Sequence, residues 1–179
     1  MSTHLRVEVH REGKVFEQEY SIGVPQYDVR EIGTSDKTGT IVTFKPDDSI
    51  FLDTIYHYDI LAARLRELSF LNKGIHLSIT DKRRTIEGTE DFVNEKFFSE
   101  GGLKEFVQFL DSTRDPILDD VIYVDGNKDD VPVEVAMIYN SSYTENIHSY
   151  VNNINTHEGG THLAGFRRAL TRTLKKYAE

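Results

Sequence analysis

The 179-residue sequence contains no cysteine and no tryptophan. The absence of cysteine excludes disulfide bridges, thiolate-ligated zinc, iron–sulfur clusters and a thiol nucleophile, and it fits a reducing compartment. No apolar run approaches the roughly 18 residues that a membrane span requires. The segment Met1 to His10 lacks the apolar core of a signal peptide. We therefore expect a cytoplasmic protein with no membrane partner.

Positive charge is also in short supply, because 30 acidic residues face 21 basic ones and the net charge is −9. Attraction of the whole molecule to nucleic acid is therefore not expected. The basic residues nevertheless gather near the C-terminus, next to the single acidic residue Glu179. These residues are Arg167, Arg168, Arg172, Lys175 and Lys176. Such a cluster is either a solvated helix face or a surface that meets a phosphate backbone.

The first half of the chain is predicted to form strands followed by one helix. Alternation of apolar and polar residues predicts a hairpin of residues 5–9 and 15–20 with a turn at 11–14, a connection over 23–36 and a strand over 39–44. Leucines at 61, 65 and 68 have helical spacing, which predicts a helix over 56–71. Asp53 or Thr54 is the expected N-cap of that helix.

The second half continues the mixture of strands and helices. Strands are expected at 75–79, 91–98, 121–124, 131–139 and 144–153, with a charged turn at 81–88 and a helix at 103–110. A last helix follows Gly159 and Gly160, with Thr161 as its expected N-cap. The order indicates an α+β or mixed α/β fold. We place a domain boundary between residues 99 and 100. Because 80 residues are few for a complete domain and the chain ends on a charged helix, we expect a fragment.

No motif in the chain forms a self-contained catalytic or metal site. The D-x-N-x-D spacing that starts at Asp125 resembles a calcium loop, but Asp130 and Ala136 stand where an EF-hand needs Gly and Glu. We interpret it as a hairpin turn. His157 and His162 lack zinc-binding spacing and a third ligand. The Gly159–Thr161 turn is either an anion site at a helix start or an ordinary helix entry. We expect no catalytic residue and no metal site here.

Five segments together resemble a known family in their expected order. They are R-E-G-K at residues 11–14, G-V-P at 23–25, K-T-G-T-I-V-T-F-K-P-D at 37–47, R-x-R-E-L-x-F-L-N at 64–72 and E-G-G-T-H-L-A-G-F-R at 158–167. The chain resembles the B-type ATPase subunits of type IIA DNA topoisomerases, which are GHKL ATPases. Two paralogous branches of that family share these blocks, and the sequence does not separate them. The resemblance implies the C-terminal part of a GHKL ATPase α/β sandwich over residues 1–99. The first part of a ribosomal-protein-like transducer domain follows over residues 100–179.

The resemblance also implies a function for the parent protein. ATP and Mg²⁺ are its cofactors, and ATP closes a dimer with a second copy around a DNA duplex. The DNA-cleaving tyrosine belongs to a different partner protein. In the family, the general-base Glu, the Mg²⁺-binding Asn and the glycine-rich lid lie upstream of this segment, and the nucleotide-reaching Gln-Thr-Lys loop lies downstream. We therefore expect this chain to hold no cofactor and to hydrolyse no ATP alone. A non-enzymatic coupling module or a weak DNA-binding module is the alternative.

Individual roles follow from the same resemblance. Thr40 matches a strand threonine that supports adenine recognition through its hydroxyl, and Val42 matches a residue in the wall of the ATP pocket. Arg11 matches an arginine at the rim where coumarin-type inhibitors bind. Arg167 matches an arginine that faces the DNA cavity, and Arg168 and Arg172 are expected to add charge for phosphates. Adjacent helical positions diverge, so Arg167 and Arg168 are not expected to point the same way.

Overall fold

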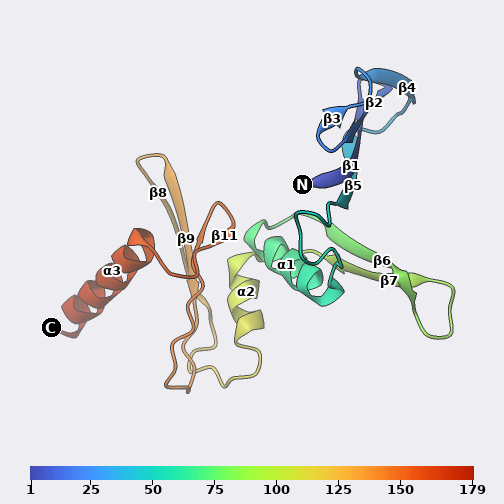
Figure 1. Cartoon of the computed structure of the whole chain (residues 1–179). Helices are drawn as coiled ribbons and strands as arrows, with labels where there is room; N and C mark the ends of the chain where they lie inside the picture. The colour runs from blue at the N-terminus through green and yellow to red at the C-terminus, as the bar shows by residue number, and fades with distance from the viewer. The chain divides into compact units, whose positions relative to one another are not determined.

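The computed structural model describes all 179 residues as two compact units, Met1–His57 and Tyr58–Glu179. Three helices and eleven strands make up a mixed α+β structure (Figure 1), which confirms the predicted fold class. No helix is both long enough and apolar enough to cross a membrane. The division at residues 57 and 58 reflects compactness within this chain. The boundary expected between residues 99 and 100 concerns family domains and stays a prediction.

The first unit is an antiparallel sheet in the order β3-β2-β1-β5, with β4 also pairing to β2. Its strands are β1 (Ser2–Arg11), β2 (Lys14–Ser21), β3 (Val24–Pro25), β4 (Arg30–Thr34) and β5 (Gly39–Pro46). The predicted β1–β2 hairpin is confirmed. Its two turn residues, Glu12 and Gly13, both have positive φ, as the common two-residue hairpin turn requires. The segment 23–36, which was expected to be only a connection, contains the short strands β3 and β4, and both pair with β2.

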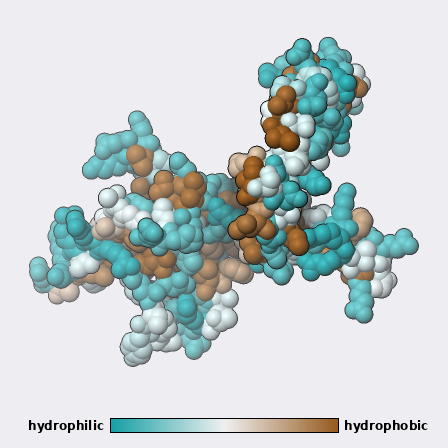
Figure 2. Space-filling model, viewed as in Figure 1, coloured by the Kyte–Doolittle hydropathy of each residue, from teal (hydrophilic) through white to brown (hydrophobic).

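The two faces of this sheet differ in polarity. Residues directly opposite in an antiparallel pair share a face, and the face alternates along each strand. The register therefore defines what we call the apolar face: Leu5, Val7 and Val9 of β1, Phe16 and Tyr20 of β2, and Thr40, Val42 and Phe44 of β5. The opposite face carries Arg6 and Glu8 of β1 and Glu17 and Glu19 of β2. Exposed apolar side chains appear as brown patches among the hydrophilic surface of this unit in Figure 2.

The polar face is organised around Glu17, whose side chain is only 5% exposed. Its carboxylate accepts hydrogen bonds from Arg6 Nε at 2.7 Å, Arg30 Nη2 at 2.8 Å and the Tyr27 hydroxyl at 2.8 Å. The hydrogen bonds from Arg30, Tyr27 and Arg6, in that order of weight, lower the pKa of Glu17 to about 2. A buried carboxylate is stable here because three donors compensate its lost hydration. This cluster ties the segment from Tyr27 to Arg30 against the sheet.

The second unit combines three helices with hairpins. Its elements are α1 (Tyr58–Leu71), β6 (Leu77–Thr85), β7 (Phe92–Phe97), α2 (Leu103–Leu110), β8 (Ile122–Lys128), β9 (Val131–Met137), β10 (Tyr150–Val151), β11 (Ile154–Asn155) and α3 (Thr161–Ala178). Strands β6–β7, β8–β9 and β10–β11 form three separate antiparallel pairs. The β8–β9 pair confirms that the acidic Asp125 segment belongs to a hairpin. Its turn lies later than expected, at Asp129 and Asp130, because β8 continues to Lys128.

Several local expectations for this unit are wrong. Helix α1 begins at Tyr58 rather than residue 56, and Asp53 instead accepts the Ile55 backbone N–H at 2.8 Å, so it caps no helix. Strand β6 runs into the charged segment that was expected to turn at residue 81. Only residues 150–151 of the strand expected over 144–153 find a partner. Gly160, not Thr161, is the N-cap of α3, and no side chain caps that helix end.

The core of the second unit lies between α1, α2 and β7. Phe97 and Phe106 are buried, and Phe70 of α1 stacks on Phe106 of α2 with ring centroids 5.2 Å apart. Ser99 bridges strand and helix, since its hydroxyl donates to Glu105 and accepts the Gly102 backbone N–H. Helix α3 buries none of its residues. Its apolar residues Leu163, Phe166 and Leu170 are half-buried, and His162 and Arg167 tie its first turns to the preceding chain.

Candidate functional site

Strand β5 brings Thr40 and Val42 onto the apolar face of the first unit. Thr40 pairs with Val9 and Val42 pairs with Val7. The Val42 side chain is 54% exposed, which is unusual for an apolar residue in the middle of an eight-residue strand. Strand β5 ends the sheet, so its outer edge pairs with no strand of this chain. The arrangement presents a flat apolar wall beside an open sheet edge, and such a wall suits the face of an aromatic ring.

A hollow of about 360 Å³ lies further along the same face. It is lined by residues of β1, β5 and the segment after β5, including Leu5, Phe44 and Tyr56. Phe44 and Tyr56 meet edge to face with centroids 6.4 Å apart. Neither Thr40 nor Val42 lines this hollow. The apolar face therefore continues from Thr40 past Phe44 into a concave surface.

Arg11 stands at the end of β1, beside the hairpin turn. By strand alternation it falls on the same face as Val9, next to the end of β5 that carries Thr40. Its side chain is 75% exposed, and its Nε donates to Glu12 at 3.0 Å. An exposed pair of this kind holds its partners weakly. The guanidinium is thus free to stack or to form bidentate contacts with a ligand.

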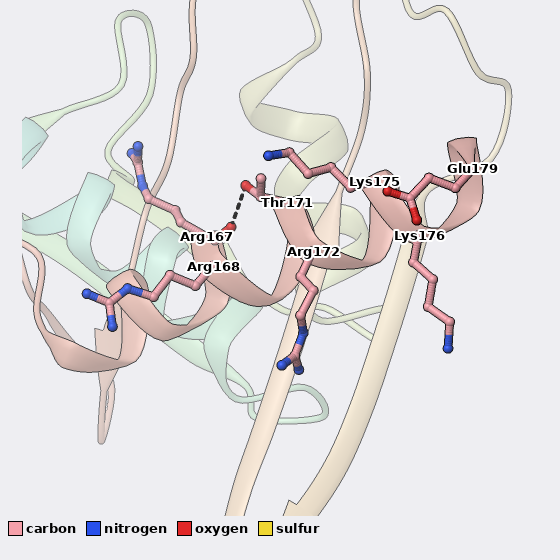
Figure 3. A pocket seen from close by; sticks show the side chains of 7 residues that line it. All are labelled: Arg167, Arg168, Thr171, Arg172, Lys175, Lys176 and Glu179. Carbon is pink, nitrogen blue, oxygen red and sulfur yellow. Dashed lines mark hydrogen bonds between the residues drawn. The ribbon is translucent and has the colours of Figure 1, made fainter.

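The basic residues of the last helix form a continuous surface (Figure 3). Arg168, Arg172 and Lys175 recur at i, i+4 and i+7, which places them on one side of α3, with Lys176 at its margin. We call these four residues the basic face. The apolar stripe of α3, which runs from Leu163 through Phe166, Leu170 and Leu174 to Tyr177, lies on the other side. None of the four basic residues makes an ion pair with another side chain.

Arg167 differs from its neighbours because it already has a partner. Its Nη2 atom donates to Glu145 Oε2 at 2.7 Å, although both side chains are more than half exposed. Figure 3 shows its side chain diverging from that of Arg168, as expected for adjacent helical positions. Arg167 is thus ion-paired with Glu145, whereas the four residues of the basic face form no ion pair.

The R-x-R-E-L-x-F-L-N block has a structural role that the sequence did not reveal. Arg66 of α1 donates to Glu95 of β7 at 2.5 Å, and its guanidinium lies 5.4 Å from the centre of the Phe97 ring. Arg64 and Glu67 instead reach the β10–β11 hairpin, where Glu67 accepts the Tyr150 hydroxyl at 2.5 Å. In the sequence, the only indication of these contacts was that the polar residues Arg64, Arg66 and Glu67 lie among the helically spaced leucines of α1.

The E-G-G-T-H block forms the entry to α3. Gly159 has a φ of 76°, a backbone conformation that residues other than glycine rarely adopt. A Cβ on Gly160 would lie 2.7 Å from Cε1 of the His162 ring, so a larger residue there would require the His162 ring to move. His162 Nε2 lies 3.2 Å from Thr156 Oγ1. These contacts explain both glycines through helix entry, without a bound anion.

No group of three or more His, Asp or Glu side chains is arranged to hold a metal ion. Thr40 and Val42 supply a hydroxyl and an apolar surface, which fit the base of a nucleotide. They supply no ligand for its phosphates or for Mg²⁺.

Comparison with known proteins places this chain in context. The family model described as DNA gyrase B matches residues 102–179. The DNA gyrase B protein from Eisenibacter elegans is 61% identical over the whole chain, and that from Cytophaga hutchinsonii is 58% identical. The chain spans 37% of the length of each. The crystal structure of the 43K ATPase domain of Thermus thermophilus gyrase B in complex with an aminocoumarin matches with a TM-score of 0.85 at 34% identity. That match covers 99% of this chain and 47% of that one.

The fold is that of a gyrase-type ATPase domain, over the part that this chain spans. The chain is similar to DNA gyrase B proteins over its whole length, and its residues 102–179 match the DNA gyrase B family model. The roles of Arg11, Thr40, Val42, Arg167, Arg168 and Arg172 remain proposals.

Proposed function

We propose that this chain works within an ATP-dependent DNA gyrase, a type II topoisomerase that changes DNA supercoiling by double-strand passage. In this proposal the first unit forms the back of the ATP pocket, and α3 faces the transported DNA. The curated relatives described above are gyrase proteins, which favours gyrase over the related topoisomerase IV. ATP bound with Mg²⁺ supplies the free energy that drives closure and reset of the DNA gate. The partners are a DNA duplex, a second copy of the same protein and the gyrase A protein.

The observation that carries this proposal is the shared face of Arg11, Thr40 and Val42. Strand register places all three at one end of the apolar face. Val42 offers exposed apolar area for a purine, and the Thr40 hydroxyl offers a polar contact at the same edge. Arg11 stands where a larger ligand would leave the pocket. The Thermus thermophilus relative was crystallised with an aminocoumarin, which supports the same face as an inhibitor site.

In this proposal, the residues that catalyse ATP hydrolysis lie in parts of the parent protein outside this chain. No residue of this chain is proposed to activate water, to bind Mg²⁺ or to contact the γ-phosphate. Phosphoryl transfer depends on such groups for positioning and charge stabilisation. We therefore expect the isolated chain to bind ATP weakly and to show no Mg²⁺-dependent turnover. Measurable turnover by the purified chain would contradict this assignment.

Substitution on the two faces of β5 tests the proposal directly. Val42→Lys places a charge on the proposed pocket wall, whereas Ile41→Lys makes the same change on the opposite face at similar exposure, 50% against 54%. In the complete gyrase B protein we expect Val42→Lys to weaken binding of a non-hydrolysable ATP analogue and of an aminocoumarin at least tenfold, about 1.4 kcal/mol. Ile41→Lys should bind both normally. Equal effects of the two variants, measured by calorimetry, would reject the pocket assignment.

A second candidate is a coupling module that binds DNA weakly without any enzymatic role of its own. The unpaired basic face of α3 favours this function for the isolated chain. DNA binding that weakens steeply with salt supports it. Absence of binding at low salt would exclude it.

A further inference from the structure

A polar network joins α1 to the β10–β11 hairpin across more than 80 positions of sequence. Glu67 accepts the Tyr150 hydroxyl at 2.5 Å and also pairs with Arg64. Arg64 Nη2 donates to the Asn153 backbone carbonyl at 2.7 Å. Asn153 Nδ2 donates to Asn72 Oδ1 at 2.8 Å. Three of these contacts cross from α1 and Asn72 to the hairpin, and the Arg64–Glu67 pair within α1 links them. Together they hold a hairpin of only two residue pairs against the helix.

The environment of these contacts makes them stronger than ordinary surface pairs. Tyr150 lies beside Phe106, with ring centroids 6.3 Å apart, and Phe106 itself stacks on Phe70 of α1. Burial, followed by the hydrogen bond to Glu67, raises the pKa of the Tyr150 hydroxyl. Burial pushes the pKa of Glu67 upward, but hydrogen bonds from Tyr150 and Arg64 outweigh it and the pKa is lowered. Charge-assisted hydrogen bonds at a partly dry site are the stronger kind.

The hairpin in turn holds the start of α3. Thr156 follows β11 directly, and its backbone N–H donates to the Ser149 carbonyl at 2.8 Å. Its hydroxyl contacts both Ser149 Oγ at 2.6 Å and His162 Nε2 at 3.2 Å, while its carbonyl accepts the Gly159 N–H at 2.8 Å. Apart from the exposed Arg167–Glu145 pair, the Thr156–His162 contact is the only side-chain hydrogen bond between α3 and the preceding chain.

We infer that Arg64, Glu67, Asn72, Tyr150 and Asn153 form a latch that sets the direction of α3 relative to α1. No residue of α3 is fully buried, and only Leu163, Phe166 and Leu170 of its apolar stripe are half-buried, so the hairpin contributes much of what fixes its direction. Resting on the proposed function, the latch controls where the basic face meets DNA. Opening the latch frees the hairpin and lets α3 reorient as a rigid rod about Gly159 and Gly160. The latch residues are positioning residues, since none of them is proposed to touch ATP or DNA.

Spin-label distances test the latch, and the lack of native cysteine makes the labelling simple. Labels are placed at Ala63→Cys on α1 and Ala169→Cys on α3, both exposed positions, in the full chain. Tyr150→Phe removes only the hydroxyl that Glu67 accepts. Tyr143→Phe is the matched control, because that residue is fully exposed and its hydroxyl makes no hydrogen bond. Asn153→Gly is a second variant, since glycine keeps the left-handed turn at φ 64° and loses only the amide.

We expect Tyr150→Phe and Asn153→Gly to broaden the distance distribution about twofold, as a helix sampling more orientations would. Backbone amides of residues 150–156 should exchange about tenfold faster, because the hairpin opens locally. Tyr143→Phe should match the unsubstituted chain. Unchanged distributions in both latch variants would overturn the inference, as would equal broadening in the control. The readout uses neither ATP nor DNA, so failure of the gyrase assignment leaves this test intact.

Discussion

Neutralising the basic face of α3 should remove a defined part of the salt dependence of DNA binding. The change is a triple substitution of Arg168, Arg172 and Lys175 by Gln. These residues carry no ion pair, recur at i, i+4 and i+7, and lie on the side of α3 that faces away from its apolar stripe. Successive members are separated by about 4.5–6 Å along the helix axis. They can therefore reach neighbouring phosphates at once without first breaking an internal contact.

The magnitude follows from counterion release. Each phosphate contact contributes about 0.9 to the slope of log affinity against log salt, so three contacts contribute about 2.7. Between 50 and 200 mM salt this part alone lowers affinity about 40-fold. The triple variant should show a slope shallower by that amount. Fluorescence anisotropy of a labelled duplex, titrated with the complete gyrase B protein at several salt concentrations, measures it.

A control with the same loss of charge separates the basic face from net charge. Lys37, Lys82 and Lys128 are exposed, lie outside α3 and make no ion pair. Their replacement by Gln should leave the slope within experimental error. If both triple variants reduce the slope equally, long-range charge explains the binding and the role assigned to α3 is wrong. An unchanged slope in the α3 variant would refute it as well.

Three further predictions concern stability. Because the folded pKa of Glu17 lies near 2 against an ordinary value of 4.5, its stabilisation is complete above pH 4.5 and is lost as pH falls from 4.5 towards 2; Glu17→Gln should flatten this part of an acid titration followed by circular dichroism. Gly159→Ala should destabilise the start of α3 by about 1 kcal/mol because of its positive φ, whereas Gly165→Ala inside the helix should stabilise it by about 1 kcal/mol; helicity during thermal melting distinguishes them, and equal signs would contradict these roles of the two glycines. Phe106→Ala should cost about 4 kcal/mol and lower the midpoint of thermal unfolding by roughly 8–16 °C; a shift below 3 °C would show that Phe106 is not central to the core.

Much of the secondary structure was predictable because its signals are local. Alternation in β1 and β2, the leucine spacing of α1 and the apolar positions of α2 all act within a few residues of one another. The family resemblance rested on short blocks in a fixed order, and comparison with known proteins confirmed it. Those blocks also brought Thr40, Val42 and Arg11 to attention before their shared face was visible.

Errors arose where a segment depends on a partner distant in sequence. The strand expected over residues 144–153 is one example, because a strand needs a neighbour and only Tyr150 and Val151 of this segment find one. Just before the segment the chain turns, where Asn140 Oδ1 accepts the Ser142 N–H at 2.9 Å. Asp53 was a reasonable helix cap by type, yet the helix starts five residues later.

The sequence by itself determined most of the strands and helices, the family resemblance and the amphipathic character of α3. Only the tertiary structure decided that Arg167 pairs with Glu145 while Arg168 and Arg172 remain unpaired. It also decided that Glu67 meets Tyr150, 83 positions away. The physical reason is the range of the forces involved. Propensity and hydrophobic periodicity act along one or two turns of chain, whereas hydrogen bonds and ion pairs depend on which distant groups the folded backbone brings within about 3 Å of each other.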